Sequence, residues 1–452
     1  MPQPLHPALA AIRQSGAAKV KVACSDIDGV LRGKYLHRDK FEGAAEGGFG
    51  FCDVVFGWDC GDVTYDNAQV TGWQHGFPDA LARLDLDTHR QVPWDGNVDF
   101  FLGEFVNPDG TPYAVCPRQI LKRVLRRAEK LGFQVMIGME YEWFNFRETS
   151  QTWAAKQGVA PEPITPGMFG YSLLRMNQQR EFFNALMDEM AAFRVPIEAL
   201  HTETGPGVYE AAITFSEALE QADRAVLFKT GAKEIGMRFG IMPSFMAKWS
   251  AQYPGCSGHI HQSLTNGKTN VFHDGGSTRG MSALFESYVA GQVACLLEFA
   301  PMFWPTINSY KRLVDGFWAP VKPTWGIDNR TASFRVLAGG PKSTRLETRC
   351  PGADVNPYLA MAAVIAAGLH GVEQNLKLTA PPVTGTNQGA ENVPRAPRTL
   401  IETTRIFGQS QIARDFLGDT FVDHFAATRD WEWRQWLDSV TDWERKRYFE
   451  II

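Results

Sequence analysis

The stretch Arg345-Leu346-Glu347-Thr348-Arg349 places three charged side chains at alternate positions of the chain. In an extended strand, alternate side chains point to the same face, so the three charges share one side of a sheet. Two further segments alternate in the same way: Glu140 and Glu142 in one, and His259, His261 and Ser263 in the other. Three such strands predict a sheet curved around a highly charged cavity.

Length and composition predict a globular protein of about two or three domains. The chain has 452 residues, of which 44% are hydrophobic and 21% charged. Its net charge of -5 provides no general basic field, so we expect neither nucleic acid nor a membrane as a partner. The most apolar run, residues 358–369, is shorter than the roughly 20 residues that cross a bilayer.

Seven cysteines occur singly along the chain, which indicates buried, reduced thiols. The N-terminal residues lack the basic segment and apolar core of a signal peptide. Both observations predict a cytoplasmic protein.

The first hundred residues predict a small β-rich unit. Residues 19–25 alternate like a strand, residues 26–29 read as a turn, and short strand-like runs continue to about residue 105. Residues 107–112 combine several turn-forming residues and form the clearest break in the chain. We therefore predict domains at 1–111 and 112–452.

Beyond this break, helical and strand patterns interleave. The spacing predicts a helix opened by Pro117, a strand at 138–144, a helix ending before Pro196, a helix capped by Ser216 and running to about Gly236, a helical stretch at 281–302, and a buried helix begun by Asn356 and Pro357. Residues 378–395 predict a surface loop before a helical, tryptophan-rich C-terminus.

Each candidate ligand has an ordinary structural explanation when it is taken singly. A glutamate pair on an exposed strand is common, His259 could be a core histidine, and Glu347 could pair with a neighbouring arginine. Glu203 and Glu210 bracket a glycine-bearing turn that would bring their carboxylates together. Together, the five glutamates and one histidine favour Mg²⁺ or Mn²⁺, because so many anions in one cavity repel each other unless cations neutralise them.

Five arginines lie close together in the sequence: Arg312, Arg330, Arg335, Arg345 and Arg349. Any one of them could be a solvated surface residue. As a group they fit a polyphosphate and an acidic substrate, since guanidinium binds phosphate and carboxylate through paired hydrogen bonds. Arginines beside a metal centre indicate phosphoryl transfer.

Several long segments resemble, in the same order, signature segments of the glutamine synthetases and their γ-glutamyl-amine ligase relatives. They are residues 255–264, 308–314, 328–332, 345–349 and 440–445. The resemblance implies an α+β fold with a small β-grasp-like N-terminal domain and a glutamine-synthetase-type catalytic domain, whose curved antiparallel sheet is flanked by helices. It also implies a homo-oligomer, either a hexameric ring or a double-ring dodecamer, with active sites between subunits.

The resemblance also implies roles for individual residues. One metal would be held by Glu142, Glu203 and Glu210, and the other by Glu140, His259 and Glu347. Arg312, Arg349 and Gly255 would bind the acidic substrate, Arg330 and Arg335 the transferred phosphate, and His261, Ser263, Lys342 and Arg345 the ATP. The implied cofactors are ATP and two or more Mg²⁺ or Mn²⁺ ions. In the implied reaction, ATP phosphorylates the γ-carboxylate of glutamate and an amine then displaces phosphate.

One position departs from the ammonia-using members of this family. Their flap carries a glutamate that collects and deprotonates ammonium, whereas residues 315–320 of this chain place Trp318 there. An indole offers an apolar face and a cation-π surface instead of a base. Our hypothesis is an organic amine that packs on Trp318. The alternatives are a glutamine synthetase that uses ammonia, and a non-catalytic structural or regulatory oligomer in which Trp318 is a packing residue.

Three further positions leave details open. Val208 replaces a glutamine that is common in the Gly-Gln-x-Glu segment of the family, and Pro254 stands where an asparagine usually contacts the amino acid substrate, so acids other than glutamate stay possible. Asp59 is our candidate for the base that deprotonates the amine, contributed by a neighbouring subunit. The alternative is an aspartate that only stabilises a turn.

Overall fold

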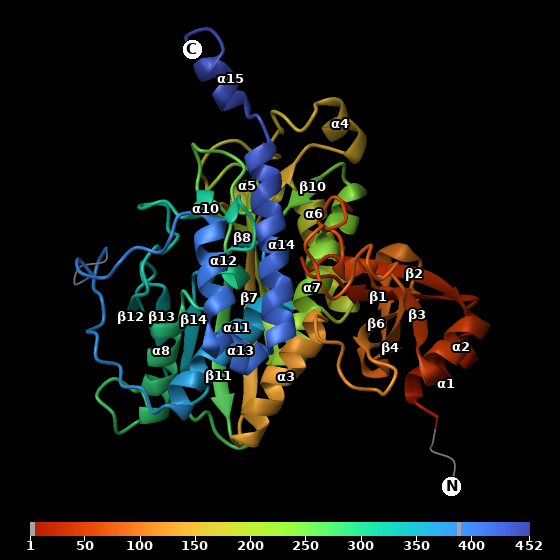
Figure 1. Cartoon of the computed structure of the whole chain (residues 1–452), viewed down its shortest axis with the longest axis horizontal. Coiled ribbons are helices and arrows are strands. Elements are labelled where there is room, and N and C mark those ends of the chain that lie inside the picture. Colours follow the sequence, from red (N-terminus) through yellow and green to blue (C-terminus); the bar gives the residue numbers. More distant parts are fainter. Residues whose placement is uncertain (1–4, 387–389) are drawn as a thin grey trace.

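The computed structural model describes residues 5–386 and 390–452. Two β-sheets organise these residues, and helices pack around them (Figure 1). The smaller sheet lies within residues 19–106 and the larger within residues 134–348. This arrangement confirms the α+β fold class. The domain boundary at 111–112 stays a prediction.

The N-terminal sheet has six strands in the order β2-β1-β6-β4-β3, with β5 also paired to β6. Strands β1 and β6 are parallel, and the other pairs are antiparallel. Buried side chains from the sheet and from two helices, including Val20, Phe41 and Phe101, form its core. The strands are β1 Lys19–Ser25, β2 Leu31–His37, β3 Phe49–Cys52, β4 Asp79–Leu84, β5 Arg90–Val92 and β6 Val98–Val106.

The second sheet has eight strands in the order β12-β13-β14-β11-β7-β9-β8, with β10 on β7. All its pairs are antiparallel except β12 with β13. The expected antiparallel sheet is therefore correct apart from this edge. The strands are β7 Gln134–Phe146, β8 Ile197–Thr202, β9 Val208–Glu217, β10 Met242–Ser244, β11 Gly258–Thr265, β12 Trp325–Ile327, β13 Phe334–Leu337 and β14 Arg345–Thr348.

Fifteen α-helices occur within the described residues. They are α1 Pro7–Ser15, α2 Arg38–Gly47, α3 Pro117–Lys130, α4 Ser150–Ala155, α5 Leu173–Gln178, α6 Arg180–Ala192, α7 Ala218–Met237, α8 Ala283–Cys295, α9 Ala300–Phe303, α10 Ser309–Arg312, α11 Pro357–Glu373, α12 Leu400–Gln409, α13 Gln411–Leu417, α14 Asp419–Asp438 and α15 Asp442–Tyr448. Short 3-10 turns lie at Asp53–Phe56, Leu86–Thr88 and Pro93–Asp95. None of the helices in the described ranges is both long and apolar enough to cross a membrane.

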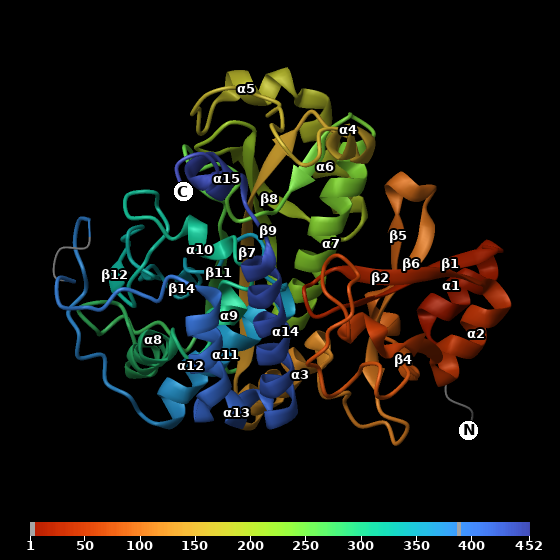
Figure 2. The ribbon, with the colours of Figure 1, turned by 45° about the horizontal axis from the view of Figure 1, so that its top comes forward.

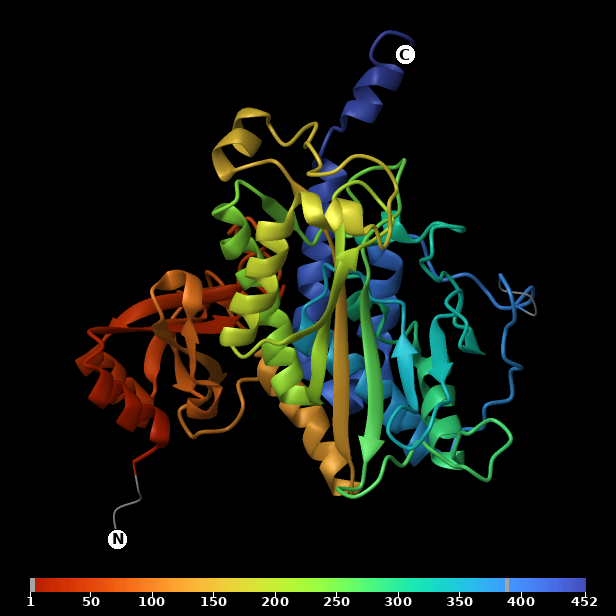
Figure 3. The same ribbon diagram turned by 180° about the vertical axis from the view of Figure 1, so that it is seen from behind.

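Helices cover one face of the large sheet and leave much of the other open. Helices α12 and α14 lie in front of the strands in Figure 2, with α3 beside the lower end of α14. Seen from the opposite direction, β7 and β11 are not covered by a helix (Figure 3). Helix α11 is almost wholly buried, and it crosses α8 closely: a Cβ on Gly291 would lie 2.2 Å from the carbonyl oxygen of Ala367. Only glycine allows this approach.

Most helix boundaries follow the expected signals. Helix α3 begins at Pro117, and the Asn356 side chain caps α11 by accepting the Tyr358 N–H. One prediction was wrong. Ser216 lies inside strand β9, where pairing with β7 outweighs its capping preference, and α7 starts after Glu217. The stretch 281–302 is divided into α8 and α9.

The C-terminal part agrees with its prediction. The described residues of the loop at 378–395 form no helix or strand, residues 387–389 lie outside the described ranges, and helices α12 to α15 follow. All seven cysteines are free, as expected, but only five are buried. Cys52 is partly exposed and Cys60 exposed, since both lie near loops of the N-terminal sheet.

The start of the chain is tied to the C-terminal helices through one turn. Asn356 donates to the carbonyl oxygens of Asp26 and Ile27, both at 3.1 Å. Arg429 of α14 is paired with Asp28 at 2.7 Å. Because Arg429 and Asn356 are both buried, these contacts fix the turn between β1 and β2 against α11 and α14.

A buried histidine in α14 predicts a pH-dependent stability. Burial lowers the pKa of His424 to about 4, against about 6.5 in an unfolded chain. Between these two values the unfolded chain binds a proton that the folded chain does not, so stability falls as the pH drops from about 6.5 towards 4. The parent protein should lose roughly 2 kcal/mol of unfolding free energy between pH 7 and pH 5 through this histidine, and His424→Leu should not show that loss. Urea unfolding at both pH values measures it, with the exposed His75→Gln as control. Equal pH dependence in all three proteins would contradict the assignment.

Candidate active site

Strand pairing decides which charged side chains meet on the open face of the large sheet. The pairs, read across β14, β11, β7, β9 and β8, are Glu347 with His261, His259 with Glu140, Glu142 with Glu210, and Glu210 with His201. Opposite residues of antiparallel strands have Cβ atoms about 5 Å apart and share a face. Side chains that are distant in sequence therefore converge as the alternating patterns predicted.

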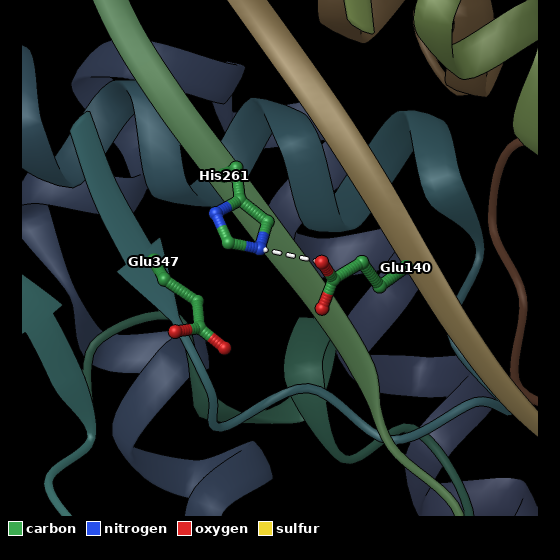
Figure 4. Close-up of side chains that lie close together, drawn as sticks. All are labelled: Glu140, His261 and Glu347. Carbon is green, nitrogen blue, oxygen red and sulfur yellow. Dashed lines mark ion pairs between the residues drawn. The ribbon is translucent and has the colours of Figure 1, made fainter. Parts of the chain in front are cut away.

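The first group of ligands combines two carboxylates and two imidazoles. His261 Nε2 lies 3.1 Å from Glu140 Oε1, and Glu347 faces both from β14 (Figure 4). His259 Nδ1 lies 3.5 Å from Glu140 Oε2 and 3.7 Å from Glu347 Oε1. Burial alone would raise the pKa of Glu140, but the two histidines hold it well below its usual range.

Glu347 is also held by two arginines. Its carboxylate binds Arg335 at 2.8 Å and Arg349 through the other oxygen, while only 1% of the residue is exposed. Burial would raise the pKa of Glu347, but Arg349 and the two histidines lower it to about 2. The arginines expected at the phosphate and at the acid substrate therefore lie beside the expected metal ligand.

The second group brings Glu203 and Glu210 together with His201. The glycine-bearing turn returns both glutamates to one place, and His201 lies 3.8 Å from Glu203 and 4.0 Å from Glu210. Glu142 stands opposite Glu210, but its Oε2 accepts the N–H of Ser257 at 2.7 Å.

This donor set fits hard divalent cations. It consists mainly of carboxylate oxygens with a few imidazole nitrogens, the ligands preferred by Mg²⁺ and Mn²⁺. The pKa of Glu210 is raised to about 9, mainly by burial and further by the nearby carboxylates of Glu142, Glu140 and Glu203. The carboxylates thus repel each other strongly, and a bound cation would relieve that repulsion.

The residues expected at ATP line one cavity beside this cluster. The cavity has a volume of about 440 Å³, and its lining includes His261, Ser263, Lys342 and Arg345. Met136, Ile137 and Phe215 supply apolar wall, so one end suits phosphates and the rest a planar base. Arg345 donates to His261 Nδ1 at 3.1 Å, which links the cavity to the first group.

Arg312 and Gly255 lie deeper than the resemblance suggests. Arg312 is 1% exposed and donates to the Cys350 carbonyl oxygen and the Ser257 hydroxyl, both at 2.9 Å. A Cβ on Gly255 would lie 2.8 Å from Arg312 Cγ, so the glycine makes room for that side chain. Arg349, whose Nε donates to the Arg330 carbonyl oxygen at 3.0 Å, lies nearer to the carboxylates. Direct substrate contact by Arg312 stays a prediction.

Trp318 stands out on the flap. The side chain is 61% exposed, and its backbone has a φ of +62°, in the left-handed region that non-glycine residues seldom adopt. Asp315 of the same flap pairs with Arg395. The flap is thus held at its base while the indole points outward.

Asp59 is engaged within its own chain. One carboxylate oxygen accepts the N–H groups of Gly61 and Val63, at 2.8 and 3.0 Å, and the other accepts the indole N–H of Trp431 at 3.0 Å. Among the described residues it bonds to no member of the charged cluster. These contacts fit the turn aspartate, and a role as base stays a prediction.

Two residues near the second group were missed. His201 alternates with Glu203, so the period-two pattern that identified the other ligands could have found it. Tyr171 carried no such signal. Its ring stacks on His201 with centroids 4.3 Å apart, and its φ is +55°. The exposed tyrosine reaches the site only because the loop before α5 folds onto β8.

Comparisons with known proteins show the family to which this chain belongs. The family described as glutamine synthetase, catalytic domain, matches residues 114–448. Type-1 glutamine synthetase 2 of Dictyostelium discoideum is 52% identical over 446 residues, which cover 98% of this chain and 85% of that protein. The glutamate–isopropylamine ligase of a Pseudomonas species is 34% identical and covers 96% and 95%. The solved GmaS/ADP complex superposes with a TM-score of 0.85 at 25% identity, over 98% of this chain and 100% of that one.

Removing a single carboxylate should weaken cation binding. We expect Glu210→Gln and Glu347→Gln each to reduce Mn²⁺ affinity by at least about tenfold, since even residues that only support metal ligands contribute this much. Electron paramagnetic resonance of free Mn²⁺ measures the affinity. Glu46→Gln, which removes one exposed charge from α2, is the control. Unchanged affinity in both site variants would place the cations elsewhere.

Proposed function

Because this chain belongs to the glutamine synthetase family, we propose that it joins the γ-carboxylate of glutamate to an organic amine at the expense of ATP. In the proposed reaction, the carboxylate oxygen attacks the γ-phosphorus and ADP leaves. The amine then attacks the acyl carbon, loses one proton and expels phosphate. The products are a γ-glutamyl amide, ADP and phosphate.

The charged face of the sheet supports the first step. Arg335 and Arg349 lie where they would neutralise a transferred phosphate and hold a carboxylate. Arg330, exposed at the edge of the cluster, would assist at the phosphate. The cavity lined by Lys342 and Arg345 would hold the ATP. When bound by the two glutamate–histidine groups, Mg²⁺ or Mn²⁺ would neutralise further phosphate charge.

The single observation that favours an organic amine is Trp318. The indole is exposed on the flap and sits on a strained backbone, a combination that is typical of functional positions. It offers an apolar surface for a hydrocarbon body and a ring face for an ammonium group. One relative is named for ligation of isopropylamine, an amine of this kind.

Ammonia remains the second candidate. The specific observation in its favour is the 52% identity to a protein named a glutamine synthetase. The two candidates share the phosphorylation step and differ only in the nucleophile. Deprotonation by Asp59 of a neighbouring subunit, a ring-shaped homo-oligomer and a cytoplasmic location belong to the same proposal.

A panel of nucleophiles decides between these candidates. We expect the purified protein, with glutamate, ATP and Mg²⁺ or Mn²⁺, to release ADP faster with alkyl or polyamines than with ammonium at equal concentration, because the indole favours an apolar body. Coupled ADP release measures the rates, and mass spectrometry identifies the amide. Preference for ammonium would establish the second candidate, and no turnover across the panel would favour a non-catalytic oligomer.

Exchange of Trp318 tests its role directly. Trp318→Glu should shift the ratio of kcat/KM values for a larger amine and ammonium by about tenfold towards ammonium, since a carboxylate stabilises a small cation better than an indole does. Trp318→Phe keeps the aromatic face and should keep the ranking. If Trp318→Glu kept the amine preference of the parent protein, another residue would be the selector.

A further inference from the structure

A second cavity lies behind the flap, separate from the charged face of the sheet. Its volume is about 770 Å³, and it is bounded by the segment after β10, by α10, by the first residue of α12 and by the end of α14. In Figure 1, α10, α12 and α14 lie next to one another. Phe317 of the flap, together with Leu313 and Val314 just before it, forms part of its wall, whereas none of the predicted metal, ATP or substrate residues does.

The lining carries positive charge without any compensating acid. Lys248, Lys311 and Arg398 line the cavity, and no aspartate or glutamate does. Within the described residues, none of the three forms an ion pair with an acidic side chain. In a protein of net charge -5, such an unbalanced group favours an anionic ligand.

Two buried donors in this wall have no acceptor. Lys248 is only 6% exposed, and neither its Nζ nor the indole Nε1 of Trp249 finds a hydrogen-bond partner among the described residues. Mutual hydrogen bonds of 2.8 Å between the Lys248 backbone and the Asn308 side chain hold this segment in place. Leaving buried donors unpaired costs free energy, and a ligand that brings acceptors would recover it.

The rest of the lining indicates the shape of the ligand. Trp249, Tyr310, Trp433 and Trp436 place aromatic rings around the cavity. The first turn of α12 also begins here, but its N-cap hydroxyl, from Thr399, donates to Glu402, whose carboxylate offsets the positive potential of the helix start. Aromatic walls with converging donors suit a flat organic anion better than a bare inorganic ion.

The cavity is connected to the flap through Phe317. The Lys248 ammonium lies 4.4 Å from the centre of the Phe317 ring, the residue just before Trp318. Nζ lies against this ring and is otherwise unpartnered among the described residues, so an anion that binds Nζ would compete with the ring for the ammonium group. We propose that this cavity binds a small aromatic carboxylate, and that its binding competes with the Lys248–Phe317 contact and thereby repositions the flap.

Fluorine NMR with 4-fluorobenzoate tests the binding. The full-length protein is first saturated with MgADP and glutamate, so that the charged face is occupied. We expect broadening of the probe signal that benzoate reverses, and that acetate and benzyl alcohol, which carry only the charge or only the ring, do not. Absence of broadening, or equal reversal by all three, would overturn the proposal.

Variants locate the site. Trp249→Phe removes one donor but keeps the ring, and Lys311→Met removes one cation. Each should weaken probe binding by about three- to tenfold, as expected for a hydrogen bond to a charged group. Lys268→Met, on an exposed loop, should have no effect. Unchanged binding in both site variants would place the probe elsewhere.

Phe317→Leu tests the coupling to the flap. Removing the ring abolishes the competing cation-π contact, so we expect this variant to bind the probe several-fold more tightly. Weaker or unchanged binding would contradict the competition. Because these measurements need no turnover, their outcome is independent of the identity of the amine.

Discussion

The mutual neutralisation of charges across neighbouring strands is the constraint on which the site depends. Glu347 is buried and stands between Arg335 on β13 and His261 on β11, with Arg349 just beyond the end of its own strand. A buried carboxylate without such partners would lose its charge or destabilise the sheet. The pairing register therefore builds the site and also supplies the opposite charges that stabilise the buried carboxylate.

The alternation in β7, β11 and β14 could be predicted from the sequence because period two is a property of any strand. It placed Glu140, His259 and Glu347 on one face before any pairing was known. The register between paired strands is not evident from the sequence. That His201 would stand opposite Glu210 follows from the turn between β8 and β9 and from a bulge in that pair.

Other differences arise from tertiary packing. Ser216 has the chemistry of a helix cap, yet strand pairing with Ile137 extends β9 past it. The burial of Arg312 against backbone carbonyl groups was likewise not evident from the sequence, while its role as a substrate ligand stays a prediction. In both cases the residue type was informative, while its burial and partners depended on elements distant in the sequence.

The backbone conformation of Trp318 affects which residue types are most stable at this position. A tryptophan at φ +62° costs on the order of 1 kcal/mol or more relative to glycine. Glycine or asparagine at this position would relieve that cost, because both adopt the left-handed region more readily. Stability therefore does not account for an indole at this position, and the flap holds its most exposed aromatic ring at a cost to the folded state.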